Sequence, residues 1–389
     1  MKKALCIILA ISLFCILEIG IFATDSSGNE GSLGVNSDFE VEAKSAMLME
    51  ANTGKILFAQ NEDEKASPAS VTKIMTLLLV MEALEDGRIG ADDKVLISDY
   101  ASSMGGSQVF LEEGEEMSVR DLIKCTVIAS ANDAAVALAE HVGGSEKIFV
   151  TMMNKRAAEL GMENTNFENV TGLDDTTTNH VTSAEDISIM SRALVKYDMV
   201  LEFSSLWQDS IRNGEFTLTN TNRLVRYYDG CNGLKTGSTD KAGYCISATA
   251  KRDGMQLIAV IMGAPTRDIR NAAARTLLDF GFSNYALYSC EERALENIQV
   301  HNGTKDITTV YSTPFSCIIP KAQIKNVEML FEIPQNITAP VKSMDCVGKI
   351  IYKLGDEELG TSNIYVSEDI EKISIWDIFL RMIKNIFIG

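Results

Sequence analysis

The segment Ser70-Val71-Thr72-Lys73 carries a hydroxyl and an amine at a spacing that suits nucleophilic chemistry. Three residues apart on a helix, the two side chains lie on one face about one turn apart, so the amine can hydrogen-bond the hydroxyl. In the first turn of a helix, free backbone N–H groups and the dipole favour a developing oxyanion next to Ser70. The same positive end, together with burial, lowers the pKa of Lys73 toward that of a general base.

Position distinguishes this pair from a chance match. A chain of this size contains on the order of one or two Ser-x-x-Lys patterns by chance, and a second one joins Ser238 to Lys241 in a polar, glycine-flanked segment. By contrast, Ser67 and Pro68 are typical of an N-cap and a first helical residue. Residues 71–84 are apolar almost all round, which predicts a buried central helix. The first pattern is therefore the candidate nucleophile site, and the second is discarded.

A second motif, Ser130-Ala131-Asn132, lies between two predicted helices. A serine here can relay a proton to a leaving nitrogen, and the Asn132 amide can hold a substrate amide in register. The motif is not specific alone, because Asn132 could simply cap the helix predicted from Asp133.

A third motif, Lys235-Thr236-Gly237, precedes a predicted strand at Gly243. The charge of Lys235 and the hydroxyl of Thr236 suit a carboxylate, and Gly237 lets a substrate backbone approach a strand edge closely. Such a tripeptide occurs by chance in roughly one chain in ten of this length, and the alternative is an ordinary turn before a strand. The three motifs in this order are far more specific than any one of them.

Together the motifs resemble those of low-molecular-mass penicillin-binding proteins that act as D-alanyl-D-alanine carboxypeptidases. The likeness covers most of the chain and extends to further short segments: Gly105-Gly106-Ser107, Thr171-Gly172-Leu173 with His180, and Gly233-Leu234 before the third motif. The resemblance implies acylation and deacylation on the D-Ala-D-Ala end of peptidoglycan stem peptides. It also implies that β-lactam antibiotics are covalent inhibitors and that neither a metal nor an organic cofactor is needed.

The resemblance implies roles for the reacting groups. Ser70 attacks the D-Ala carbonyl, and Lys73 accepts its proton. Ser130 with Lys235 passes a proton to the departing D-Ala.

Other residues are implied to bind the substrate. Asn132 orients the peptide, and Thr236, with Arg270, holds the terminal carboxylate; Arg267 is a near rival of Arg270. Gly237 admits the substrate backbone, and the backbone amides of the nucleophile and Ser238 form the oxyanion hole.

Two alternative functions remain. A β-lactamase would need a deacylating base after the second motif, and although Glu163 and Glu168 lie in that interval, neither carries the expected flanking pattern. A catalytically silent wall-binding protein is disfavoured because the motif residues are intact. His180 is a further candidate base, but its polar loop favours a structural role.

The surrounding elements predict an α/β fold, and the resemblance implies that it is the transpeptidase fold of β-lactamases and penicillin-binding proteins. A β-hairpin at 46–59 is followed by helical patterns, then by strands at 243–250 and 257–262 and a helix near 270–280. This order predicts one antiparallel sheet flanked by helices, in a catalytic domain at 41–288. The helical patterns lie at 71–84, 119–128, 133–142, 146–160 and 184–195.

Two further segments follow. Short β-prone stretches predict a small all-β domain at 289–370, with strands at 307–311, 316–319 and 349–353. The tail at 371–389 repeats apolar residues every three or four positions around Trp376, which predicts an amphipathic helix lying in a membrane surface. The alternative is a helix packed on the β-domain.

The other end predicts export. Two lysines precede an apolar run at 4–22, which indicates a signal peptide at 1–23 and then a polar linker at 24–40. An uncleaved transmembrane anchor is the alternative, disfavoured by Glu18. Either places the enzyme on the outer face of the cytoplasmic membrane. The net charge of -19 disfavours a nucleic-acid partner, and the six cysteines beyond residue 23 form no CxxC pair, so buried free thiols are expected.

Overall fold

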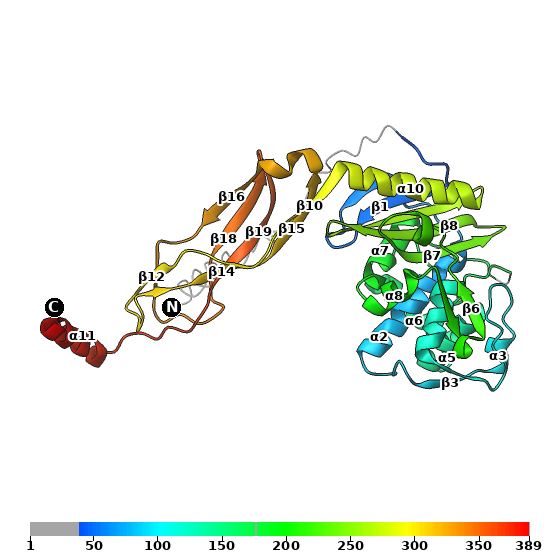
Figure 1. Cartoon of the computed structure of the whole chain (residues 1–389), viewed down its shortest axis with the longest axis horizontal. Helices are drawn as coiled ribbons and strands as arrows, with labels where there is room; N and C mark the ends of the chain where they lie inside the picture. Colours follow the sequence, from blue (N-terminus) through cyan, green and yellow to red (C-terminus); the bar gives the residue numbers. More distant parts are fainter. Residues whose placement is uncertain (1–38, 176, 389) are drawn as a thin grey trace, which may run out of the picture. The chain divides into compact units, whose positions relative to one another are not determined.

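The computed structural model describes residues 39–175 and 177–388, so the predicted signal and nearly all of the predicted linker lie outside the described residues. The first part of the chain is built on a five-stranded antiparallel sheet (Figure 1). Its strands follow one another in the order β2 (Ile56–Gln60), β1 (Ser45–Glu50), β9 (Met255–Ala264), β8 (Gly243–Arg252) and β7 (Cys231–Thr239). Early and late strands therefore share one sheet, as predicted.

Both faces of this sheet are buried. Along β1, Met47 and Met49 join the core under the helical block, whereas Ala46 and Leu48 join the core under α10 (Arg267–Asn284). The alternation follows because successive side chains of a strand point to opposite faces. Figure 1 shows α10 along one face of the sheet and the other helices of this part on the opposite face.

The helical block comes between β2 and β7 in the sequence. Its helices are α2 (Lys73–Glu85), α3 (Asp99–Ser102), α4 (Val119–Lys124), α5 (Asn132–Gly143), α6 (Glu146–Glu159), α7 (Ala184–Leu194), α8 (Asp198–Ser204) and α9 (Leu224–Tyr227). Two short antiparallel ribbons accompany them: β3 (Lys94–Leu96) with β4 (Glu116–Ser118), and β5 (Gln208–Ile211) with β6 (Phe216–Thr219).

Helix α2 lies at the centre of the block. Ile74, Leu77, Leu78 and Val80 are each at most 1% exposed, which confirms the buried helix predicted from its apolar sequence. Burial of each such side chain stabilises the fold by about 1.5–3 kcal/mol. The helix that carries Lys73 is therefore a rigid support.

The structure confirms the predicted hairpin, helices and strands and corrects their ends. The helix predicted over 119–128 is α4 followed by a π-helical turn, Cys125–Ala129. Helix α10 begins at Arg267 rather than 270, because the side chain of Thr266 accepts the Ile269 N–H at 3.2 Å and caps it. The segment from 196 to 230, for which no element was predicted, contains α8, β5, β6 and α9.

The second part of the chain is rich in β-structure, as predicted. Strand β10 (Tyr285–Cys290) pairs with β15 (Phe315–Pro320) and spans the predicted boundary between 288 and 289. A five-stranded sheet has the order β11 (Arg293–Ala294), β14 (Val310–Ser312), β19 (Glu357–Val366), β18 (Cys346–Leu354) and β16 (Val327–Glu332). A smaller sheet has the order β13 (Ile307–Thr308), β12 (Ile298–His301) and β17 (Asn336–Thr338).

The last element is α11 (Ile375–Ile388), which has exposed apolar side chains. Ile375 is 85% exposed, Trp376 75% and Leu380 60%. Within the two described ranges, no helix combines the length and the apolar character needed to cross a bilayer.

The six cysteines of the described residues are all free thiols. Cys125, Cys231 and Cys245 are buried, as predicted for such thiols, whereas Cys290 and Cys317 are half-buried and Cys346 is exposed.

Candidate active site

The candidate nucleophile lies in a short 3₁₀ turn, Ala69–Thr72, that precedes α2. The predicted N-cap at Ser67 is wrong: Pro68 precedes the turn without a side-chain cap, and the buried Ser67 hydroxyl has no hydrogen-bond partner among the described residues. The reason is local, because Ala69 adopts a left-handed backbone with φ 47° and interrupts any helix starting at Pro68. Ser70 therefore stands in a tight turn just ahead of the helix.

Lys73 is the first residue of α2 and is fully buried. Its Nζ donates to Ser70 Oγ at 2.9 Å and to the Thr171 carbonyl at 2.8 Å. Burial, and then the positive charge of Lys235, hold the pKa of Lys73 well below its usual value, against the opposing effect of Asp133. A neutral amine in contact with a serine hydroxyl can accept its proton.

Ser130 is presented by the π-helical turn at the end of α4. It adopts a left-handed backbone with φ 61°, which separates that turn from α5. Its Oγ accepts a hydrogen bond from Lys235 Nζ at 2.8 Å. The second and third motifs are thus in direct contact, although 105 positions separate them in the sequence.

Asn132 is the first residue of α5, not its cap, because Ala131 occupies the capping position. Its Nδ2 donates to the Gly105 carbonyl at 2.7 Å, which fixes the amide. Its Oδ1 is buried and has no partner among the described residues. A fixed and unused acceptor suits the N–H group of a ligand amide.

Lys235, Thr236 and Gly237 lie inside β7, so the motif is itself part of a strand rather than preceding one at Gly243, and the alternative of an ordinary turn is wrong. They pair with Ser247, Ile246 and Cys245 of β8. Since β7 is the last strand of its sheet, its other edge has no strand partner within residues 39–175 and 177–388 and can accept an extended ligand.

Gly237 of β7 packs directly against the turn that carries Ser70. A Cβ atom there would lie 2.7 Å from the Ser70 backbone nitrogen and 2.8 Å from the Pro68 carbonyl oxygen. Only glycine leaves this space. The next residue, Ser238, also lines the cavity beside Ser70.

The Lys235 amine is buried, and its pKa lies near neutral pH. Burial, and then the charge of Arg270, lower its pKa to about 7. Besides Ser130, its Nζ contacts the Thr236 carbonyl at 2.8 Å. The Thr236 hydroxyl donates to Thr221 Oγ1 at 2.8 Å.

Both candidate arginines line the same cavity. Arg270 is buried and donates to Asn271 Oδ1 at 2.9 Å and to the Cys245 carbonyl at 3.4 Å. Burial and the neighbouring Arg267 lower the pKa of Arg270 to about 10. Arg267, by contrast, is exposed.

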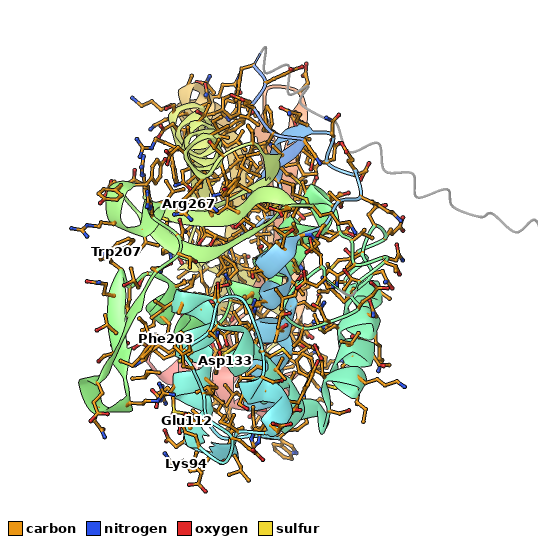
Figure 2. The ribbon with its side chains drawn as sticks, turned by 90° about the vertical axis from the view of Figure 1, so that its right-hand side faces the viewer. Lys94, Glu112, Asp133, Phe203, Trp207 and Arg267 are labelled. Carbon is orange, nitrogen blue, oxygen red and sulfur yellow. The ribbon has the colours of Figure 1, made fainter. Side chains whose placement is uncertain are left out.

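A cavity of about 480 Å³ brings these groups together. In Figure 2 the labelled Trp207 and Arg267 lie near the strands of the sheet, above Asp133 among the helices. The residues that line the cavity are Ser70, Ser107, Ser130, Trp207, Thr219, Asn220, Thr221, Arg223, Thr236, Gly237, Ser238, Arg267 and Arg270. Lys73 and Lys235 lie behind this lining and contact Ser70 and Ser130 in it. Asn132 also lies behind it, and its backbone N–H donates to the carbonyl of the lining residue Ser107 at 2.7 Å.

Sequence reasoning missed one wall of this cavity. Trp207, Arg223 and the stretch 219–221 come from the segment after α7, where no motif or periodic pattern gave a signal. It also missed the carboxylate of Asp133, which is fully buried and accepts the Val109 and Leu111 N–H groups at 3.0 and 3.1 Å. That carboxylate fixes the loop that carries Ser107. Among residues 39–175 and 177–388, no cluster of His, Cys, Asp and Glu could hold a metal ion.

Two family models match the chain. Residues 33–266 match the peptidase S11 family, described as D-alanyl-D-alanine carboxypeptidase, and residues 282–372 match the C-terminal domain of penicillin-binding protein 5. The chain belongs to the D-alanyl-D-alanine carboxypeptidase family. The resemblance predicted from the motifs and the predicted fold class are both confirmed. The chain is a serine-type, penicillin-binding D-Ala-D-Ala carboxypeptidase.

Several known proteins are similar to this carboxypeptidase over most of its length. A D-alanyl-D-alanine carboxypeptidase of Bacillus subtilis, DacF, is 44% identical over 343 residues, 86% of this chain and 88% of that protein. Penicillin-binding protein 5 from Haemophilus influenzae is 32% identical in its crystal structure and has a TM-score of 0.73, covering 86% of this chain and 99% of that one. Penicillin-binding protein D2 from Listeria monocytogenes, in its ampicillin-bound form, is 32% identical and has a TM-score of 0.58. The match covers 63% of this chain and 98% of that one.

Proposed function

We propose that this carboxypeptidase removes the terminal D-alanine of stem pentapeptides through an acyl-enzyme on Ser70. Lys73 takes the hydroxyl proton as Ser70 Oγ bonds to the carbonyl carbon of the penultimate D-alanine. The observation that carries this assignment is the 2.9 Å hydrogen bond between Lys73 Nζ and Ser70 Oγ, because the pKa of this amine is lowered. The backbone N–H groups of Ser70 and Ser238 would stabilise the oxyanion.

We propose that Ser130 donates the proton that the leaving D-alanine nitrogen requires when the C–N bond breaks. Its bond to Lys235 Nζ supports this role, because a nearby cation favours proton loss from the hydroxyl. Lys73 then returns the Ser70 proton to the Ser130 oxygen. Water attacks the ester of Ser70, and its proton passes to Lys73 and from there to Ser70 Oγ as the shortened peptide leaves.

We propose that the substrate binds along the free edge of β7. The free Oδ1 of Asn132 would accept a peptide N–H, and Gly237 leaves room for the backbone. Thr236 and Arg270 would hold the terminal carboxylate. The buried Arg270, which shares the cavity with Ser70, is a better candidate than the exposed Arg267 because charge-assisted bonds are stronger away from water.

The nucleophile is tested by replacing Ser70 with alanine. In the wild type, a fluorescent penicillin should label one peptide that contains Ser70, and diacetyl-Lys-D-Ala-D-Ala should release D-alanine. Ser70→Ala should lose both while keeping its melting temperature. Labelling that survives in Ser70→Ala would move the nucleophile to another residue and overturn the proposal.

The β-lactamase alternative finds little support in the position of Glu168. Its carboxylate accepts hydrogen bonds from the backbone N–H groups of Thr178 and Asn179 at 2.8 and 3.0 Å. These bonds connect the two ends of the segment 168–179, which is a structural role. We therefore expect a long-lived penicilloyl-enzyme and slow nitrocefin turnover. Fast nitrocefin hydrolysis without release of D-alanine would favour a β-lactamase.

We also propose that the protein works on the outer face of the cytoplasmic membrane and is held there by α11. The exposed apolar side chains of α11, with Trp376 among them, suit a helix that lies in the membrane surface. The signal at 1–23, the linker at 24–40 and the domain limits at 41–288, 289–370 and 371–389 are part of the same proposal.

A further inference from the structure

The residue before the nucleophile is held in an unfavourable conformation. Ala69 has φ 47°, a left-handed backbone that is unfavourable for a residue with a Cβ atom. Such strain persists only where surrounding contacts hold it. Two groups contact the Ala69 carbonyl: the hydroxyl of Thr72, which donates to it at 2.8 Å, and the backbone of Gly172, where a Cβ would come within 1.8 Å of that oxygen.

The Thr72 hydroxyl is itself oriented by His180. Thr72 Oγ1 and His180 Nε2 are 2.8 Å apart, and both residues are at most 1% exposed. The other ring nitrogen, Nδ1, accepts the Glu168 N–H at 3.0 Å, so it carries no proton. A neutral ring then has its proton on Nε2 and donates to Thr72, which leaves the single hydroxyl proton of Thr72 for Ala69. Burial lowers the pKa of His180 to about 4, which is consistent with a neutral ring.

The loop that supplies His180 also holds the base. Lys73 Nζ donates to the carbonyl of Thr171, and Asn169 Oδ1 accepts the Gly172 N–H at 2.7 Å. Phe167 packs edge-on against the His180 ring with centroids 5.7 Å apart. One loop therefore fixes the carbonyl before Ser70 and the amine that contacts Ser70.

We propose that His180 and Thr72 are positioning residues for the nucleophile, and this inference rests on the proposed role of Ser70. The chain of donors from His180 through Thr72 to the Ala69 carbonyl holds the Ser70 hydroxyl and backbone N–H against Lys73 and β7. Neither residue lines the substrate cavity. Their loss should therefore slow acylation with little change in substrate binding.

Thr72→Val removes the hydroxyl and keeps the shape of the side chain. Since a displacement of about 1 Å in a reacting group can cost about 100-fold, we expect the acylation rate with fluorescent penicillin to fall by about 10- to 100-fold. The kcat for the peptide should fall alongside it, with KM within about twofold of wild type. Thr72→Ser, which restores the hydroxyl, should recover most of the rate.

Thr76→Val is the matched control. Thr76 lies one turn further along α2, is fully buried and donates to the Val170 carbonyl at 2.7 Å. Both valine variants lose a buried hydroxyl bond to a backbone carbonyl, so we expect similar losses of thermal stability. Only Thr72→Val should slow acylation.

His180 is tested by two variants and a double-mutant cycle. His180→Phe keeps a ring beside Phe167 but loses both hydrogen bonds, whereas the amide of His180→Gln can still donate to Thr72. We expect His180→Phe to be acylated as slowly as Thr72→Val. The acylation rate of His180→Gln should lie between that of His180→Phe and that of the wild type. Because both residues act through one chain, the double variant His180→Phe/Thr72→Val should be no slower than the slower single variant.

Three results would overturn the inference: acylation of Thr72→Val at the wild-type rate, an equal loss in Thr76→Val, or additive losses in the double variant. Failure of the proposed function looks different, because the wild type itself would then carry no label at Ser70. Mapping the labelled peptide of the wild type therefore separates the two.

Discussion

Burial sets the proton chemistry of both active-site lysines. Lys73 and Lys235 are each at most 1% exposed, and in both cases burial is the largest cause of the lowered pKa. Each amine also lies near another cation, which lowers its pKa further. Desolvation therefore suits Lys73 to the base role that we propose for it and leaves Lys235 able to change charge near neutral pH.

The role of base that we propose for Lys73 predicts a large loss of acylation in Lys73→Arg. The guanidinium cannot release its proton at usable pH, and general-base catalysis typically contributes 10²–10⁴-fold. We expect acylation of the folded variant by fluorescent penicillin to fall by about 10³-fold, and its melting temperature to fall as well, because a larger, permanently charged group replaces a fully buried amine. An acylation rate within tenfold of wild type would assign the base elsewhere.

The lowered pKa of Lys235 predicts the basic side of the pH profile. The amine is a cation below about pH 7 and neutral above it, so a step that needs the cation should slow as the pH rises through 7. In Lys235→Arg the charge persists to far higher pH. We therefore expect kcat/KM of this variant to be lower at pH 6 but to lack the decline above pH 7. The same decline in both proteins would show that another group titrates.

At the scale of elements, the close packing of β7 against the 3₁₀ turn fixes the position of Ser70 relative to the third motif. Gly237→Ala would place a Cβ 2.7 Å from the Ser70 nitrogen, among backbone atoms that cannot rotate away. We expect acylation to fall by at least about 100-fold, measured with fluorescent penicillin. Ser238→Ala on the same strand keeps the backbone N–H and should retain most of the rate. Equal losses in the two variants would mean that any change in β7 is harmful.

The long, strongly patterned elements were predictable from sequence, and the irregular ones were not. The apolar sequence of residues 71–84 marked a buried helix, and the short apolar runs within 46–59 marked a β-hairpin. The left-handed Ala69 carried no signal, because alanine is not typical of that conformation. The placement of the third motif inside β7 was missed because Gly233 and Gly237 suggest turns. For the site, the motif residues were found, whereas Trp207 and Arg223 come close only through the tertiary fold.

At the scale of the whole molecule, charge is distributed unevenly. The chain has a net charge of -19, yet Arg223, Arg267 and Arg270 line the candidate site, and none forms an ion pair within the described part of the chain. A cleft lined by one sign of charge concentrates ligands of the opposite sign. The cavity can therefore attract a carboxylate although the protein as a whole is acidic.

The membrane role that we propose for α11 predicts a change in tryptophan fluorescence. The chain has two tryptophans, Trp207 and Trp376, so Trp207→Phe leaves only the one in α11. On addition of phosphatidylglycerol vesicles, we expect its emission to shift to shorter wavelength and the protein to sediment with the vesicles. Deletion of residues 371–389 should abolish sedimentation and preserve acylation. Unchanged emission with the protein left in solution would contradict the surface helix.

The near-neutral pKa of Lys235 also has a thermodynamic consequence for ligand recognition. At pH 7 an amine with a pKa of about 7 is half protonated, and an arriving carboxylate favours its charged form. Binding should therefore draw up to about half a proton from the buffer for each ligand. Titration calorimetry of Ser70→Ala with a D-Ala-D-Ala peptide, in phosphate and in Tris, would reveal this uptake as a difference between the two measured heats. The difference should vanish when Lys235→Arg is added to the same variant.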